Sequence, residues 1–191
     1  MIEWPDDALK ECVNISTRFT DHLNIIDIGA HYGETFQTLA SNLQSQFSYV
    51  GLEPDPKSFK IYNKNSHAIL ESSNCLSFVS LNQAASSSSG SEEFTKTKAD
   101  AVSGLLKPVK GLSERVLSGD HEIIDTFTVQ TTTIDQIIRK QSFSKVSLLK
   151  IDTEGFDLEC LKGAAEALEN NLIDIIMCEA FFVRYREGQC Y

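Results

Sequence analysis

Short apolar runs alternate with stretches of helical periodicity along most of the chain. The runs cover residues 24–28, 47–52, 76–81, 127–130, 146–151 and 172–178. Their short lengths and polar boundaries predict β-strands. Apolar residues at helical spacing predict helices around residues 8–15, 35–43, 57–65, 134–138 and 158–168. This alternation predicts an α/β fold in which helices cover both faces of a mostly parallel sheet.

The stretch 24–35 predicts a buried strand, a glycine-rich turn and the start of a helix. Gly29 and Gly33 remove side chains where a backbone must turn or approach a ligand closely. A dinucleotide fingerprint, G-x-G-x-x-G, would need further glycines at the positions of His31 and Glu34. Glu34 would also repel an anionic pyrophosphate at the helix start. A ligand that combines a nucleoside with a cationic centre therefore fits this turn better.

Polar residues at the ends of the next two runs complete the predicted nucleoside site. Glu53 ends the second run, where a carboxylate can accept hydrogen bonds from both hydroxyls of a ribose. Asn82 and Gln83 follow the third run, where an amide could contact adenine. The arrangement is the one expected for S-adenosylmethionine. The alternative is a purely structural glycine turn with a solvated Glu53.

A second group of acidic residues follows the later runs. Asp152 and Glu154 come directly after the run 146–151, and Glu179 follows the run 172–178. If these strands are parallel, the acids lie at the same edge of the sheet as the glycine turn. Lys150 interrupts the apolar run, and we expect it to form a salt bridge with a neighbouring acid because a buried lysine needs a partner.

Composition limits the classes of partner. The 191 residues include 17 Lys and Arg against 27 Asp and Glu, for a formal net charge of −10. This charge disfavours nucleic acid and anionic membrane surfaces as partners. The sequence shows no run long enough to span a membrane, an acidic rather than basic start, and five scattered cysteines without a C-x-x-C pair. These features predict a cytoplasmic protein with reduced thiols.

The length predicts a single domain over residues 1–191. Within it we expect an N-terminal helical segment at residues 1–22 and an irregular loop or lid at residues 86–121. The second segment is rich in serine, glycine and lysine and lacks firm periodicity. Residues 92–97 are a candidate edge strand inside it, and residues 103–106 are a candidate loop over the site.

Four segments of the chain together resemble the FkbM family of S-adenosylmethionine-dependent methyltransferases. They are residues 26–33 (IDIGAHYG), 51–56 (GLEPDP), 148–155 (LLKIDTEG) with LKGA at 161–164, and 176–179 (IMCE). The resemblance implies a Rossmann-like class I methyltransferase sheet and methyl transfer, typically to a hydroxyl oxygen of a sugar, polyketide or other small metabolite. Because the family fold normally adds two further strands, it also implies a sheet that lacks its last two strands, an edge that a homo-oligomer could complete.

Methyl transfer from a sulfonium donor suggests a role for each candidate residue. The donor-binding set is Asp27, Gly29, Ala30 and Gly33 for the methionine part, Glu53 for the ribose, and Asn82 or Gln83 for adenine. Asp152, Glu154 and His31 are the candidate catalytic residues, since methylation of a hydroxyl requires removal of its proton.

Each of these roles has an alternative. Glu154 could instead complement a helix dipole, and His31 could be a turn residue without a catalytic role. Asp152 with Glu179 could hold a divalent cation, which we do not favour, so no metal ligand is predicted. For the whole chain, the alternatives are a non-catalytic nucleoside-binding or assembly module and an NAD-dependent oxidoreductase.

Overall fold

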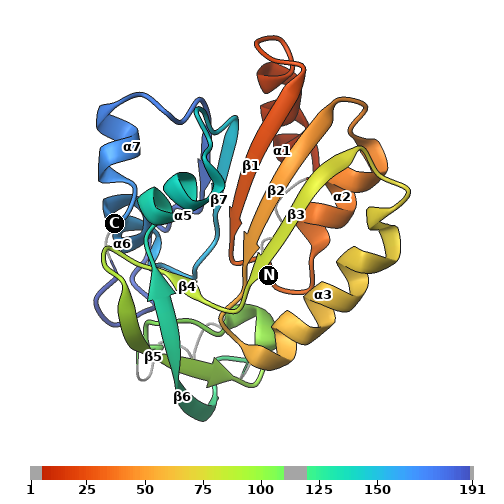
Figure 1. The fold of residues 1–191 in the computed structure, drawn as a ribbon. Helices are drawn as coiled ribbons and strands as arrows, with labels where there is room; N and C mark the ends of the chain where they lie inside the picture. Colours follow the sequence, from red (N-terminus) through yellow and green to blue (C-terminus); the bar gives the residue numbers. More distant parts are fainter. Residues whose placement is uncertain (1–5, 110–119, 190–191) are drawn as a thin grey trace.

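The computed structural model describes residues 6–109 and 120–189, and its centre is a five-stranded parallel sheet (Figure 1). The strand order is β3-β2-β1-β7-β8, and every neighbouring pair is parallel. The strands are β1 (His22–Ile28), β2 (Gln46–Leu52), β3 (Cys75–Leu81), β7 (Leu148–Ile151) and β8 (Ile176–Cys178). The prediction of an α/β fold with a parallel sheet is confirmed. The described part of the chain adds no strand to this sheet beyond β8.

Helices cover both faces of the sheet, as the apolar pattern predicted (Figure 1). One face carries α1 (Asp6–Ser16), α2 (Glu34–Asn42) and α3 (Pro56–Leu70), and the other carries α5 (Ile134–Gln141), α6 (Asp157–Lys162) and α7 (Ala165–Glu169). Adjacent residues of β1 serve the two cores, because side chains of a strand alternate between faces. Ile25 packs with the α1, α2 and α3 side, and Ile26 packs with the α5, α6 and α7 side. None of the described helices is long and apolar enough to cross a bilayer.

A second, three-stranded sheet lies beside the carboxyl edge of the main sheet (Figure 1). It has the order β4-β6-β5, from β4 (Ala84–Ala85), β5 (Gly90–Thr97) and β6 (Ile123–Thr132). A short 3₁₀ helix, η1 (Asp100–Val102), follows β5. The two long strands pair antiparallel along their lengths.

The second sheet corrects the expectation of an irregular segment at residues 86–121. The candidate edge strand at residues 92–97 is present and extends back to Gly90. Apolar periodicity did not reveal the start of β5 because Gly90 and Ser91 are exposed and carry no apolar side chain, and Phe94 is the one apolar residue of the strand. The rest of that segment, residues 110–119, lies outside the described residues, as do residues 1–5 of the predicted N-terminal helical segment.

The register of the main sheet sets the position of the site. Ile28 at the end of β1 pairs with Leu52 of β2 and with Ile151 of β7. The residues that follow these three positions therefore leave the sheet at one level. They are Gly29, Glu53 and Asp152.

Candidate active site

A cavity of about 870 Å³ lies at the carboxyl edge of the main sheet. Its volume is typical of sites for small molecules and cofactors. Residues 100–105, which follow β5, form part of its wall. The turns after the five strands of the main sheet supply Gly29, Ala30, His31, Glu53, Gln83, Asp152, Glu154 and Glu179. The cavity thus brings together most of the residues that the sequence singled out.

The turn after β1 requires glycine at position 29 for two reasons. Gly29 has φ +83°, a left-handed conformation that L side chains rarely adopt. A Cβ atom there would lie 2.0 Å from the carbonyl oxygen of Asp152. The N–H groups of Gly29 and Ala30 both donate to the carbonyl of Leu52, at 3.0 and 2.8 Å. The turn is therefore held tightly between the ends of β2 and β7.

Glu53 is a buried carboxylate in the cavity wall, with a relative exposure of 6%. Its Oε2 accepts the N–H of His31 at 2.9 Å, and its Oε1 accepts the N–H of Asp55 at 2.8 Å. Burial raises the pKa of Glu53 to about 7, although these N–H groups favour the charged form. Each carboxylate oxygen has a second lone pair, so both can still accept a hydrogen bond from a bound molecule.

Asp152, Glu154 and Glu179 form an acidic cluster at the opposite part of the wall, after β7 and β8. One carboxylate oxygen from each lies within 4.8 Å of the others. Burial, together with the negative charges of Asp152 and Glu154, raises the pKa of Glu179 to about 8. Burial also raises the pKa of Glu154. A carboxyl group with a pKa near neutrality can both accept and release a proton under physiological conditions.

Cations of the protein already contact two members of this cluster. The Nζ atom of Lys150 lies 3.5 Å from Oδ2 of Asp152. Glu154 accepts hydrogen bonds from Nη2 of Arg186 at 2.9 Å and from the hydroxyl of Tyr185 at 3.0 Å. A divalent cation would have to compete with Lys150 and Arg186 for these oxygens, so the contacts do not favour a metal centre.

His31 lies between the two parts of the wall in an unusual backbone conformation, with φ +47°. Its ring stacks on Tyr32 with 3.7 Å between centroids, and its Nδ1 lies 3.3 Å from Oε1 of Glu34. Its Nε2 is buried without a hydrogen-bond partner in the described structure. A buried polar atom of this kind in a cavity wall is available to a ligand.

Three residues of the predicted donor-binding set lie outside the cavity wall. Asp27 is fully buried and bonds to the hydroxyl of Tyr49 and to Nζ of Lys150. The expected salt bridge of Lys150 is thereby confirmed. Gly33 faces α3, where a Cβ atom would lie 2.9 Å from the ring of Tyr62.

Asn82 is the third of these residues. Its amide donates to the carbonyls of Glu53 and Pro54, at 2.8 and 3.0 Å. In the structure it holds the turn after β2, whereas its neighbour Gln83 lines the cavity. The contacts described for Asp27, Gly33 and Asn82 are all made within the protein. Their direct contact with a methyl donor therefore stays a prediction.

The family model described as the methyltransferase FkbM domain matches residues 27–189 of the chain. The chain belongs to the FkbM methyltransferase family. The crystal structure of methyltransferase FkbM from Methylobacillus flagellatus KT shares the fold, with a TM-score of 0.51 and 19% sequence identity. The match covers 80% of this chain and 32% of that one, so this chain spans about a third of its length. No curated protein matches the chain significantly.

The site of this FkbM family member also contains residues that the sequence did not single out. Tyr32 and Asp100 both line the cavity and are joined by a hydrogen bond of 2.7 Å. Arg186, which orients Glu154, is fully buried. Asp100 and Arg186 lie in stretches without hydrophobic periodicity, and nothing in the sequence indicates that such polar residues are buried or half-buried. Lys96, inside the candidate edge strand, was the one detectable hint, because a lysine in a half-buried strand needs an acidic partner.

Proposed function

We propose that this FkbM family protein is an S-adenosylmethionine-dependent methyltransferase that methylates a hydroxyl group of a small metabolite or sugar. The observation that carries the proposal is the composition of one cavity. The glycine turn and Glu53 lie in one part of its wall, and the acidic cluster after β7 and β8 lies in another. A carboxylate suited to a ribose and a group able to take a proton thus line the same cavity.

The residues present fit the donor. Glu53 keeps a free lone pair on each oxygen for a ribose diol, and Gln83 offers an amide for adenine. Gly29 and Ala30 bring main chain without bulk to the wall, and the unpartnered Nε2 of His31 is available to a polar group of the methionine part. S-adenosylmethionine, when bound, would supply an electrophilic methyl group on sulfur.

The acidic cluster would provide the acid–base chemistry. A hydroxyl oxygen becomes a good nucleophile when its proton is removed as it reacts, and a carboxylate with a pKa near neutrality is suited to that role. Asp152, Glu154 and His31 are the candidates from the sequence, and the position of Glu179 adds it to them. Lys150 and Arg186 hold Asp152 and Glu154 in place.

The charge of the protein supports an uncharged acceptor. Lys150 and Arg186 offset the charges of Asp152 and Glu154, and Glu179, with a pKa of about 8, is largely protonated at neutral pH, so the acidic cluster carries little net charge of its own. The formal net charge of the chain is −10, and the field of the whole protein would repel a phosphorylated or nucleic acid acceptor. A neutral polyol in the cytoplasm is the acceptor class that we propose.

Calorimetric titration of the purified protein with S-adenosylmethionine, S-adenosylhomocysteine and NAD tests the donor. We expect the two sulfur compounds to bind and NAD to bind more weakly. Release of S-adenosylhomocysteine over a panel of methyl glycosides and polyols then tests turnover. Tighter binding of NAD would support an oxidoreductase instead, and donor binding without turnover on any acceptor would support a non-catalytic module.

A further inference from the structure

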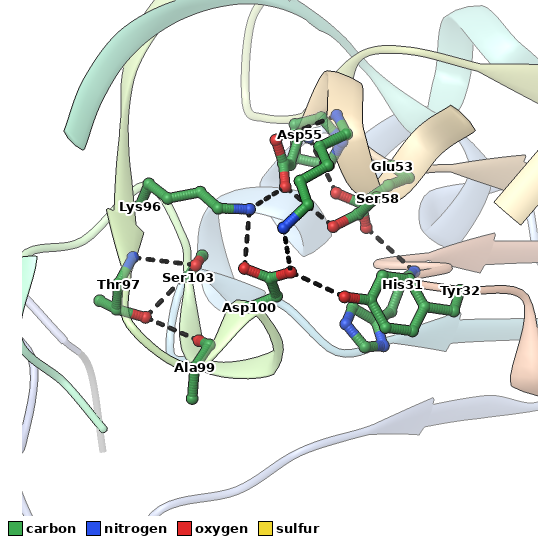
Figure 2. A network of polar contacts seen from close by, with 12 residues as sticks. His31, Tyr32, Glu53, Asp55, Ser58, Lys96, Thr97, Ala99, Asp100 and Ser103 are labelled. Carbon is green, nitrogen blue, oxygen red and sulfur yellow. Dashed lines mark hydrogen bonds and ion pairs between the residues drawn. The ribbon is translucent and has the colours of Figure 1, made fainter. Parts of the chain in front are cut away.

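The carboxylate of Glu53 belongs to a closed ring of polar contacts (Figure 2). Its two oxygens are each fixed by one backbone N–H, from His31 in the turn after β1 and from Asp55 in the turn after β2. The side chain of Tyr32, the next residue after His31, reaches Asp100 in η1, and the side chain of Asp55 reaches Lys96 in β5. The ring therefore connects the carboxylate to residues distant in the sequence.

Lys96 of β5 and Asp100 of η1 close this ring (Figure 2). The hydroxyl of Tyr32 donates to Oδ2 of Asp100 at 2.7 Å. Oδ1 of Asp100 lies 2.9 Å from Nζ of Lys96, and Lys96 also donates to Asp55. Lys96 and Asp55 are 7% and 5% exposed, so solvent screens their interaction little.

Residues 100–105, which form part of the cavity wall, are fixed by contacts with β5 and with this ring. Thr95 and Gly104 exchange two backbone hydrogen bonds, of 2.8 and 3.1 Å. The hydroxyl of Ser103 accepts the N–H of Thr97 at 3.1 Å. The segment is thus anchored to β5, and through Asp100 and Lys96 it is anchored to the two turns that hold Glu53.

A buried ion pair adds little net stability, because the desolvation of both charges offsets their attraction. It does determine where its partners lie. Preorganisation of a binding group reduces the entropy that a ligand must otherwise lose on binding. A ring that includes both Glu53 and Asp100, at the start of the wall segment 100–105, is well placed to provide such preorganisation.

We propose that Lys96 and Asp100 are positioning residues that set the affinity of the cavity for a nucleoside, acting through Tyr32 and Asp55 on the carboxylate of Glu53. The proposal rests on the proposed function, because it assumes that Glu53 binds the ribose hydroxyls. It assigns β5 and η1 a role in donor binding in addition to forming part of the cavity wall.

Two variants test this proposal with S-adenosylhomocysteine as the probe. Tyr32→Phe removes the hydroxyl that bonds to Asp100 and keeps the aromatic side chain that stacks on His31. We expect this variant to bind S-adenosylhomocysteine about three- to tenfold more weakly, mainly through faster dissociation. Lys96→Met breaks both arms of the ring, and we expect a loss of at least about tenfold, with affinity largely retained in the conservative variant Lys96→Arg. Glu93→Gln, which removes an exposed ion pair with Lys107 from the same strand, is the matched control and should bind as the wild type does.

A second measurement separates positioning from a general loss of structure. Adenosine carries the two ribose hydroxyls, and 2′,3′-dideoxyadenosine lacks both. We expect Tyr32→Phe to weaken the binding of adenosine and to leave the binding of 2′,3′-dideoxyadenosine unchanged. Equal losses for both nucleosides, or wild-type affinity of Tyr32→Phe for S-adenosylhomocysteine, would overturn the proposal.

Amide hydrogen exchange of the free protein makes the test independent of the donor. We expect Tyr32→Phe to speed exchange both in residues 30–33 and in residues 100–105, whereas Glu93→Gln leaves both segments unchanged. If the wild type binds no S-adenosylhomocysteine but Tyr32→Phe shows this paired change, the proposed function is refuted and the structural coupling stands. An exchange rate unchanged in either segment would refute the coupling itself.

Discussion

Nζ of Lys150 lies 3.1 Å from Oδ1 of Asp27, and both side chains are almost completely buried. Asp27 also accepts a hydrogen bond from the hydroxyl of Tyr49. This pair joins the two central strands β1 and β7 directly beneath the cavity, and it supports Asp152 through the same ammonium group.

Replacement of Lys150 by methionine should destabilise the protein by about 3–5 kcal/mol, because it leaves the buried carboxylate of Asp27 without its cation. The double variant Asp27→Asn with Lys150→Met should recover a large part of this loss, which a double-mutant cycle from urea unfolding would measure. Lys162→Met, which removes an exposed ion pair with Glu159, is the control and should change the unfolding free energy by less than about 1 kcal/mol. Additive effects of the two central substitutions would contradict the pairing.

The glycine turn predicts a contrast between two glycines. Gly29→Ala places a Cβ atom 2.0 Å from the carbonyl of Asp152 in a left-handed conformation, whereas a Cβ atom at Gly90 meets nothing within 4 Å. We expect Gly29→Ala to destabilise the protein by at least about 2 kcal/mol and to weaken donor binding, and Gly90→Ala to remain within about 1 kcal/mol of wild type. Thermal unfolding of the two variants side by side measures the difference. Equal melting temperatures would show that the close approach at Gly29 is not a constraint.

The main sheet was predictable from the sequence because strands such as 24–28 and 146–151 are apolar and end in glycine or acid. The apolar composition of such strands by itself indicates that they are buried. The ring around Glu53 was not predictable, because Lys96 and Asp55 are 41 residues apart and meet only when the second sheet docks. No local pattern in β5 specifies that contact.

The same distinction explains the outcome for the two motif glycines. Both Gly29 and Gly33 have positive φ, so the turn motif correctly marks a special backbone. Only their surroundings in three dimensions separate Gly29 in the cavity wall from Gly33 against Tyr62. Spacing alone cannot distinguish a glycine that admits a ligand from one that admits a neighbouring helix.

Donor binding should depend on pH through Glu53, whose pKa burial raises to about 7. The charged carboxylate accepts hydrogen bonds from both ribose hydroxyls, so the affinity for S-adenosylhomocysteine should rise by about tenfold between pH 6 and pH 8. Glu53→Gln should bind more weakly, by about 1–3 kcal/mol, and without this pH dependence. Calorimetry of both proteins across the range tests the assignment. A parallel rise in the variant would assign the titration to another group.

Glu179 should make the protein less stable at alkaline pH. Burial and the neighbouring carboxylates raise its pKa from an ordinary value of 4.5 to about 8 in the folded state. The folded protein therefore binds this proton more tightly than the unfolded chain, and the resulting stability is complete below pH 4.5 and is lost as the pH rises through 8. Glu179→Gln should accordingly be more stable than the wild type at pH 9, by about 1 kcal/mol because solvent partly screens the half-buried carboxylate, and should match it near pH 4.

Urea unfolding at the two pH values measures this difference, and a divalent cation provides a further comparison. Because Lys150 and Arg186 already contact Asp152 and Glu154, we expect added magnesium to leave the stability of the wild type at pH 9 unchanged. Stabilisation by magnesium in the wild type that is absent in Glu179→Gln would instead show that the cluster binds a metal through that carboxylate. In that case the alkaline destabilisation would report the absence of the ion and not a proton held by Glu179.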